Sequence, residues 1–159
     1  PDVLVKAQVG CLAQMMKVYD YLGESANIIA VEEVPRERVH MYGAVGIGER
    51  KGDAFTITGM VEKPSRASAP SNLIITGRYI LQPEIFDILE TQEGGAGGEI
   101  QITDAMIGLS ERMPFYGLQF AGRTYDCGSK IGYLEATVEY ALKHPEVRDE
   151  FSAFLRQRF

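Results

Sequence analysis

The chain has 159 residues, of which 45% are hydrophobic and 24% are charged, and its net charge is −6. These values are typical of a folded domain and exclude an intrinsically disordered chain. The acidic balance and the lack of a long basic block argue against a nucleic-acid partner. No apolar run approaches about 18 residues, so we expect no membrane partner. Cys11 and Cys127 are too few for a disulfide scaffold, which makes a reduced, cytoplasmic setting the default expectation.

Strand and helix patterns alternate at the start of the chain. Residues 3–5 and 27–31 are short apolar runs that predict buried strands. Residues 10–22 between them predict a helix with one apolar face, formed by Leu12, Met15, Met16, Tyr19 and Leu22. The order strand, helix, strand favours a parallel pair. Because Pro1 leads straight into a strand, we expect the chain to be the later part of a longer protein.

The remainder of the chain combines single strands with helices. Strands are expected over residues 42–47, 55–61, 73–81 and 115–120, separated by loops that include 48–53, 62–71, 91–98 and 121–128. Helices are expected after Pro83, over 104–112 with Thr103 as the N-cap, over 129–143, and from Pro145 onward. This combination indicates an α/β fold with a mixed sheet.

Two carboxylates are candidates for a metal site. Asp2 lies next to the first strand, and Asp126 lies in a loop just before the helix over 129–143. Carboxylates that converge from separate loops suit Mg²⁺, which prefers oxygen ligands and retains waters and substrate phosphates. The ordinary alternative is that Asp2 is simply exposed and Asp126 is a turn residue, and the pattern alone favours that alternative.

Glu62 and Lys63, which directly follow the strand over 55–61, and two glycines at other strand edges are further candidates. Glu62 could accept hydrogen bonds from sugar hydroxyls, and Lys63 could hold a phosphate as a point charge. Gly43 and Gly77 neighbour aromatic residues at strand edges, where glycine lets a ligand contact the backbone. A surface ion pair and close strand packing are the alternatives, and spacing alone favours them.

Several sequence strings occur together in a fixed order. They are Val61–Pro64, Ala69–Leu73, Gly77–Leu81, Gly95–Ala105, Tyr125–Gly128, Lys130 and Gly132-Tyr133. In this order they closely resemble the C-terminal part of the bacterial UTP–glucose-1-phosphate uridylyltransferase family. The resemblance covers essentially the whole chain.

The resemblance implies a Rossmann-like mixed sheet of the sugar-nucleotidyltransferase type. It implies a sugar-phosphate- and metal-binding portion over residues 1–143 and a C-terminal helix over 144–159. UTP and glucose 1-phosphate would be the substrates, UDP-glucose and pyrophosphate the products, and Mg²⁺ the cofactor. Asp2 and Asp126 match the metal-binding aspartates of the family.

The resemblance also assigns roles to the sugar-side residues. Glu62 would hydrogen-bond glucose hydroxyls, and Lys63 would contact the sugar phosphate as the catalytic residue. Gly43 and Gly77 would offer backbone groups to the sugar. Lys130 matches a further substrate-binding position, with no specific role implied.

The chain departs from the family in one large respect. The glycine-rich loop that holds the triphosphate is absent, so the N-terminal nucleotide-binding portion is missing and the chain alone is expected to be inactive. The family commonly forms dimers or tetramers, which predicts a homo-oligomer. The alternatives are a thymidylyl- or cytidylyltransferase and a non-catalytic sugar-phosphate-binding or regulatory fragment.

Overall fold

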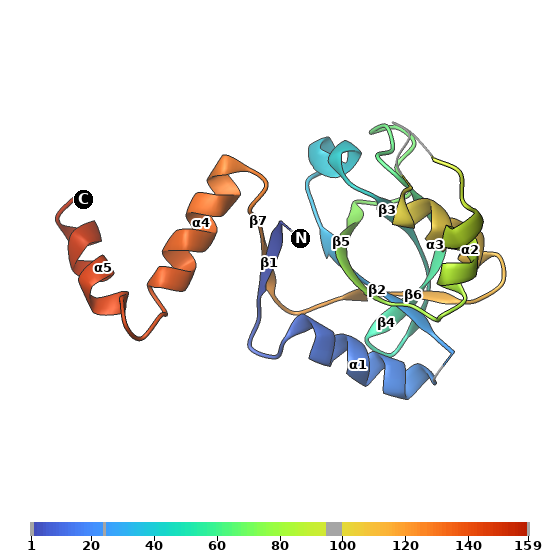
Figure 1. Cartoon of the computed structure of the whole chain (residues 1–159), viewed down its shortest axis with the longest axis horizontal. Helices are drawn as coiled ribbons and strands as arrows, with labels where there is room; N and C mark the ends of the chain where they lie inside the picture. The colour runs from blue at the N-terminus through green and yellow to red at the C-terminus, as the bar shows by residue number, and fades with distance from the viewer. Residues whose placement is uncertain (1, 24, 95–99, 159) are drawn as a thin grey trace. The chain divides into compact units, whose positions relative to one another are not determined.

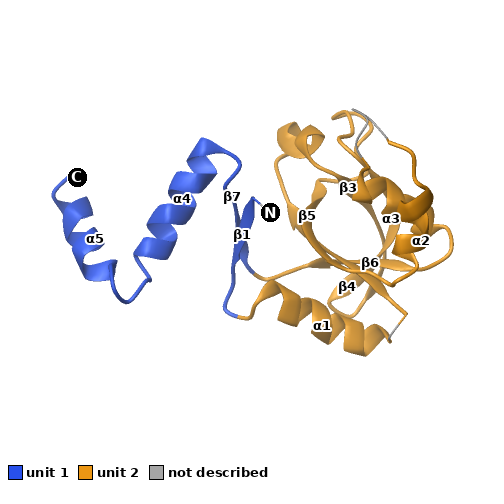
Figure 2. Cartoon of the chain, in the orientation of Figure 1, with its two compact units in different colours: residues 1–8, 122–159 blue, residues 9–121 orange. Residues whose placement is uncertain are grey.

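The computed structural model describes residues 2–23, 25–94 and 100–158 (Figure 1). The chain divides into two compact units, coloured separately in Figure 2. Unit 1 comprises residues 1–8 and 122–159, and unit 2 comprises residues 9–121. Most of the glycine-rich part of the predicted loop over 91–98 lies outside the described residues. Within these ranges, no helix has both the length and the apolar character needed to cross a membrane.

A closed barrel of five strands forms the centre of unit 2, and Figure 1 presents its strands as a ring. The strands are β2 (Asn27–Glu33), β3 (Ala44–Lys51), β4 (Ala54–Val61), β5 (Leu73–Ile80) and β6 (Phe115–Gln119). Their order is β2-β5-β3-β4-β6, and β2 closes the barrel against β6. The β2–β6 pair is parallel and the other pairs are antiparallel, which confirms the predicted mixed sheet.

The core of unit 2 lies between the barrel strands and two short helices. All of Asn27–Val31 is buried, as the apolar run predicted. Helices α2 (Ile85–Thr91) and α3 (Ile102–Ser110) add Ile85, Met106 and Leu109 to the same apolar cluster. Gln101 occupies the N-cap position of α3, whereas Thr103 lies inside the helix and is buried. The prediction of Thr103 as the N-cap was therefore wrong.

Helix α1 (Cys11–Leu22) packs on the barrel through a face that the sequence did not single out. Its buried residues are Cys11, Met15 and Val18, whereas Leu12 is 60% exposed. Of the predicted face, Met15 is buried and Tyr19 and Leu22 are half-buried, whereas Leu12 and Met16 are exposed, so the prediction was only partly right. Apolar residues occupy two overlapping stripes of this helix. Gly23, with φ of 96°, ends the helix as predicted.

Two further elements of unit 2 differ from the expectation. Strand β3 continues to Lys51, so the predicted loop over 48–53 shrinks to a tight hairpin turn at Gly52, where φ is 63°. A 3₁₀ helix, η1 (Arg36–Met41), precedes β3 and was not predicted. It leads the chain into Tyr42 and Gly43.

Unit 1 is built on a two-stranded antiparallel ladder. Strand β1 (Val3–Lys6) pairs with β7 (Arg123–Asp126), and Val3 lies opposite Asp126. The predicted parallel pairing of residues 3–5 with 27–31 was therefore wrong, and the predicted loop over 121–128 contains a strand. The four residues of β7 are rich in polar side chains, and their alternation of apolar and polar residues is too weak to predict a strand from sequence.

Two helices complete unit 1. Helix α4 (Lys130–Ala141) packs on β7 and buries Gly132 and Ala136, and Ser129 is its N-cap. The apolar face that the sequence predicted for it, with Ile131, Leu134 and Val138, is exposed. Helix α5 (Arg148–Arg156) buries none of its residues.

Candidate functional site

The start of β3 and the end of β4 place Glu62 beside Gly43. Ala44 pairs with Val61 across these strands, so the residues next to them are neighbours. A Cβ added to Gly43 would lie 3.0 Å from Glu62 Oε2 and 3.0 Å from Ile75 Cδ1. Glycine at position 43 therefore leaves room for the Glu62 carboxylate next to the main chain. These two residues, both assigned to the sugar by the family resemblance, are neighbours in unit 2.

Lys63 follows Glu62 in an unusual backbone conformation. Its φ is 43°, which makes it the one non-glycine residue with positive φ among the described residues. Its N–H donates to the Tyr42 carbonyl at 3.1 Å, which ties the segment to the chain just before Gly43. The left-handed conformation costs roughly 1–2 kcal/mol for an L-residue. Such strain concentrates at functional sites.

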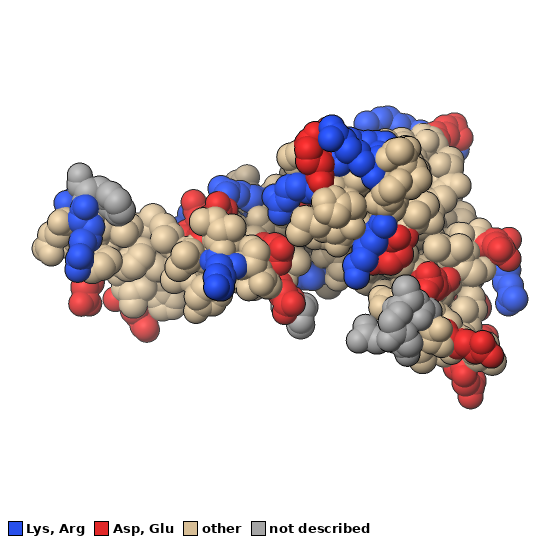
Figure 3. Space-filling view, turned by 90° about the horizontal axis from the view of Figure 1, so that it is seen from above, with Lys and Arg blue, Asp and Glu red and all other residues tan. Residues whose placement is uncertain are grey.

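The Lys63 ammonium is available to an anion. Its side chain is exposed, and it forms no ion pair with any residue in the described ranges. On the face shown in Figure 3, basic and acidic side chains are interspersed. Elsewhere in the chain, exposed charges form ion pairs such as Arg66–Glu37, at 2.8 Å. Lys63 thus follows Glu62 directly in the sequence and forms no ion pair with a carboxylate of the described residues.

A bulge in β5 carries Gly77. Ile75 of β5 lies opposite Val31 of β2 and Tyr79 lies opposite Ile29, so four steps along β5 match two along β2. Gly77 sits in this bulge with φ of 74°, is exposed, and would have open space around an added Cβ. Bulges re-aim strand residues and are common next to functional sites. Glycine is required here by the backbone conformation and not by crowding.

Thr76 in the bulge was not singled out by the sequence, and Tyr79, just beyond the bulge, was noted only as an aromatic neighbour of Gly77. Buried Thr76 donates a hydrogen bond from its hydroxyl to the carbonyl of Ala30, at 2.9 Å. Ala30 is the β2 residue that the bulge leaves without an opposite residue. Burial raises the pKa of Tyr79, and the nearby Glu62 carboxylate raises it further, whereas Arg78 lowers it. The phenol of Tyr79 thus belongs to the surroundings of Glu62 and stays protonated at neutral pH.

In unit 1, Asp2 and Asp126 direct carboxylate oxygens toward the same point. A Cβ added to Gly128 would lie 3.1 Å from Asp126 Oδ1 and 3.5 Å from Asp2 Oδ2. The Gly128 N–H donates to Asp126 Oδ1 at 3.1 Å, and the Cys127 N–H donates to the Asp2 carbonyl at 2.6 Å. The ladder between β1 and β7 therefore brings together two aspartates that are 124 positions apart in the sequence.

The chemistry of this pair fits a divalent cation of the magnesium type. Both side chains offer hard oxygen donors beside a glycine that leaves the space open. No cluster of three or more His, Cys, Asp or Glu that could hold a metal occurs within the described ranges. A cation here would complete its shell with waters and phosphate oxygens, as Mg²⁺ commonly does.

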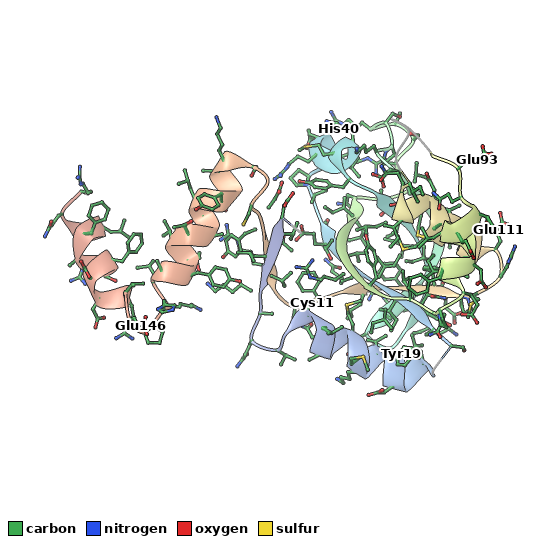
Figure 4. All side chains as sticks on the ribbon, in the orientation of Figure 1. Cys11, Tyr19, His40, Glu93, Glu111 and Glu146 are labelled. Carbon is green, nitrogen blue, oxygen red and sulfur yellow. The ribbon has the colours of Figure 1, made fainter. Side chains whose placement is uncertain are left out.

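In unit 2, Cys11 on α1 and His40 on η1 lie well apart and form no common site (Figure 4).

Lys130 lies at the first position of α4, four positions after Asp126 in the sequence. Its exposed side chain borders an open hollow of about 400 Å³. Cys127, Gly128 and Tyr133 also line this hollow.

Each predicted site residue therefore lies at one of two places. Gly43, Glu62 and Lys63, with Gly77 on the adjacent β5, belong to unit 2, and Asp2, Asp126 and Lys130 belong to unit 1.

Comparison with known proteins identifies the family of the chain. The family model described as "Nucleotidyl transferase" matches residues 2–143. A UTP–glucose-1-phosphate uridylyltransferase from Staphylococcus haemolyticus is 45% identical over 156 residues, covering 98% of this chain and 54% of that protein.

Two solved structures are also similar. The structure of a UDP-glucose pyrophosphorylase complexed with UDP-glucose is 41% identical with a TM-score of 0.81, covering 90% of this chain and 54% of the other. A UTP-bound UGPase from Acinetobacter baumannii is 38% identical with a TM-score of 0.80, covering 98% and 53%. The chain therefore spans about half the length of these relatives. Because the family model matches well over half of its residues, the chain belongs to the nucleotidyl transferase family.

Proposed function

We propose that this chain supplies the glucose 1-phosphate-binding and Mg²⁺-binding part of a UTP–glucose-1-phosphate uridylyltransferase, and that this part is the C-terminal one. The observation that carries the proposal is the position of Glu62 against the Gly43 backbone, with the strained Lys63 next to it. A carboxylate beside a glycine backbone suits sugar hydroxyls, and a neighbouring ammonium suits the phosphate on the same sugar. The related structures bound to UDP-glucose and to UTP support this choice of substrates.

On the sugar side, the residues of this chain act by positioning. Glu62 accepts hydrogen bonds from glucose hydroxyls, while the backbone at Gly43 and at the Gly77 bulge approaches the ring closely. Lys63 holds the sugar phosphate as a point charge and offsets part of its negative charge. Lys130, at the start of α4 in unit 1, is kept as a further substrate-binding residue without a specific role. Fixing the reacting groups in this way lowers the barrier without a covalent intermediate.

The reaction needs no nucleophile from the protein. A phosphate oxygen of glucose 1-phosphate forms a bond to the α-phosphorus of UTP, and the bond from that phosphorus to the β-phosphate oxygen breaks. Pyrophosphate leaves with the electron pair. Asp2 and Asp126 hold the Mg²⁺, which neutralises the crowded phosphate charge when it is bound.

Assembly is also part of the proposal. Exposed apolar side chains, Val147 just before α5 and Phe154 on α5, support a homo-oligomer, either a dimer or a tetramer. Because the chain spans about half of its relatives, we expect the 159-residue chain alone to bind glucose 1-phosphate without turning over UTP.

The experiment is pyrophosphate release from UTP and glucose 1-phosphate with Mg²⁺, using the complete enzyme that carries this chain. We expect Lys63→Ala to lower kcat/KM by about 10- to 100-fold, because a charge-assisted contact contributes about 1.5–3 kcal/mol. Lys17→Ala, a change at an exposed lysine of α1, is the matched control and should leave kcat/KM unchanged.

Substitution of dTTP for UTP in the same assay tests the nucleotide. Turnover that prefers dTTP would replace the uridylyl assignment. No turnover with either nucleotide, together with retained glucose 1-phosphate binding, would favour a binding module. Equal kinetics for Lys63→Ala and the unchanged enzyme would contradict the role of Lys63.

A further inference from the structure

The turn that carries Asp126 is packed against α4 without space for a side chain. Gly132 lies in the first turn of α4 and is buried. A Cβ added to Gly132 would overlap the Asp126 carbonyl oxygen and would lie only 2.8 Å from both the Asp126 carbonyl carbon and Ser129 Oγ. Two of these neighbours are main-chain atoms, so a side chain at position 132 would have to displace the backbone of Asp126 or of α4.

Ser129 joins the same two elements by hydrogen bonds. Its hydroxyl donates to the Asp126 carbonyl at 2.9 Å and accepts from the Gly132 N–H at 3.1 Å. Its own N–H donates to the same Asp126 carbonyl at 3.2 Å. The hydroxyl of Ser129 is thus both the N-cap of α4 and a direct tie to the main chain of Asp126.

These contacts bear on the carboxylate pair because they fix the backbone from which Asp126 extends. The Asp126 side chain is only partly buried, and its Oδ1 has one described hydrogen bond, from the Gly128 N–H. The direction of the carboxylate therefore depends on the turn more than on packing around the side chain. Displacement of such a group by about 1 Å can cost a hundredfold in function.

We propose that Ser129 and Gly132 are positioning residues that hold Asp126 in place to share a divalent cation with Asp2. The proposal rests on the metal site of the proposed function. Ser129 acts through its hydroxyl, which locks the carbonyl of Asp126 onto the start of α4. Gly132 acts through the lack of a side chain, which lets α4 approach that carbonyl. Both residues act on the main chain of Asp126, and neither is proposed as a ligand of the cation.

The test measures cation binding directly on the complete enzyme. Mn²⁺ replaces Mg²⁺, and the signal of free Mn²⁺ in electron paramagnetic resonance gives the Kd. Supporting groups of this kind typically contribute 10- to 100-fold in metal affinity. We therefore expect Gly132→Ala and Ser129→Ala to raise the Kd for Mn²⁺ by about 10- to 100-fold. Ser129→Thr keeps the hydroxyl and should restore affinity close to that of the unchanged protein.

Gly108→Ala is the matched control, because Gly108 also lies inside a helix and a Cβ there would make only ordinary contacts of 3.7 and 3.8 Å with Ile88. It should leave the Kd unchanged. If Gly132→Ala does not yield folded protein, Ser129→Ala and Ser129→Thr decide the question, since the first removes the hydroxyl without adding an atom and the second keeps the hydroxyl.

Asp126→Asn separates the two levels of the proposal. If Asp126→Asn weakens Mn²⁺ binding while Ser129→Ala and Gly132→Ala do not, the positioning role is wrong and the metal site stands. If Asp126→Asn leaves Mn²⁺ binding unchanged, the metal site fails, and the positioning role fails with it. A loss of affinity in Ser129→Ala that Ser129→Thr does not restore also contradicts the role of the hydroxyl.

Discussion

The two units hold their candidate residues by different means. In unit 2, Glu62 and Gly77 extend from a closed barrel whose interior is apolar and buried. In unit 1, Asp2 and Asp126 extend from a two-stranded ladder, and α4 buries only Gly132 and Ala136. In unit 1, the close approach of α4 to the Asp126 main chain and the hydrogen bonds between them take the place of a large apolar core.

This difference indicates which substitutions each unit tolerates. An isolated two-stranded ladder is marginally stable in water, so unit 1 depends on the contacts of α4 with β1 and β7. The Tyr140 hydroxyl donates to the Val5 carbonyl at 3.3 Å, and Lys6 forms an ion pair with Glu139. In unit 2, by contrast, stability is expected to follow the burial of apolar side chains.

The largest expected effect comes from the same leucine truncation made in each unit. Leu109 on α3 is 1% exposed, whereas Leu134 on α4 is 57% exposed. Leu109→Ala should lower the free energy of unfolding by about 2–5 kcal/mol, because it leaves a cavity in the barrel core. Leu134→Ala should change it by less than about 0.5 kcal/mol. Urea unfolding measures both, and similar losses for the two variants would contradict the contrast between the units.

The bulge in β5 should show an effect of intermediate size. Thr76→Val keeps the shape of the side chain but leaves the buried Ala30 carbonyl without the Thr76 hydroxyl. We expect a loss of about 1–3 kcal/mol in the free energy of unfolding. Thr58→Val, at an exposed position of β4, is the control and should be nearly neutral. Equal values for the two variants would show that the bulge does not depend on this hydrogen bond.

The smallest expected effect is a pH dependence at Tyr79. Its pKa in the folded protein is raised above the ordinary value of 10.0, first by burial and then by Glu62. Above pH 10 the unfolded chain therefore loses this proton more readily than the folded chain, and stability falls as pH rises toward the folded pKa. Tyr79→Phe should flatten this decline in urea unfolding between about pH 9 and pH 11. An unchanged slope, equal to that of the exposed-site variant Tyr21→Phe, would contradict it.

The sequence predicted most strands and helices where apolar periodicity was strong. The buried run at Asn27–Val31 and the alternation along β4 are examples. Strand β7 was missed because its four residues are stabilised by pairing with β1, which is remote in sequence. The barrel closure likewise depends on non-local pairing of β2 with β6, which residue patterns do not encode.

The candidate residues were found mainly through the family resemblance, because spacing alone favoured ordinary explanations for them. Glu62, Gly43, Asp2 and Asp126 then fell into two groups with close geometry. Ser129 and Gly132 carried no separate signal, since a serine before a helix is commonly only a cap. Their contacts with Asp126 become visible once the turn is seen in space. The placement of this chain in the C-terminal half of its relatives, the division at residue 143 and the cytoplasmic setting stay predictions.

The measurement that tests the central claim most directly is a pair of titrations on Lys63→Ala and Asp126→Asn. Mn²⁺ binding is followed by electron paramagnetic resonance, and glucose 1-phosphate binding without metal is followed by calorimetry. We predict that Asp126→Asn weakens Mn²⁺ binding at least tenfold and leaves glucose 1-phosphate binding unchanged. Lys63→Ala should do the reverse, with a loss of about 1.4 kcal/mol or more for glucose 1-phosphate. The assignment of sugar and metal binding to separate units is contradicted if either variant weakens the binding of both ligands equally. It is also contradicted if either variant weakens the binding of neither ligand.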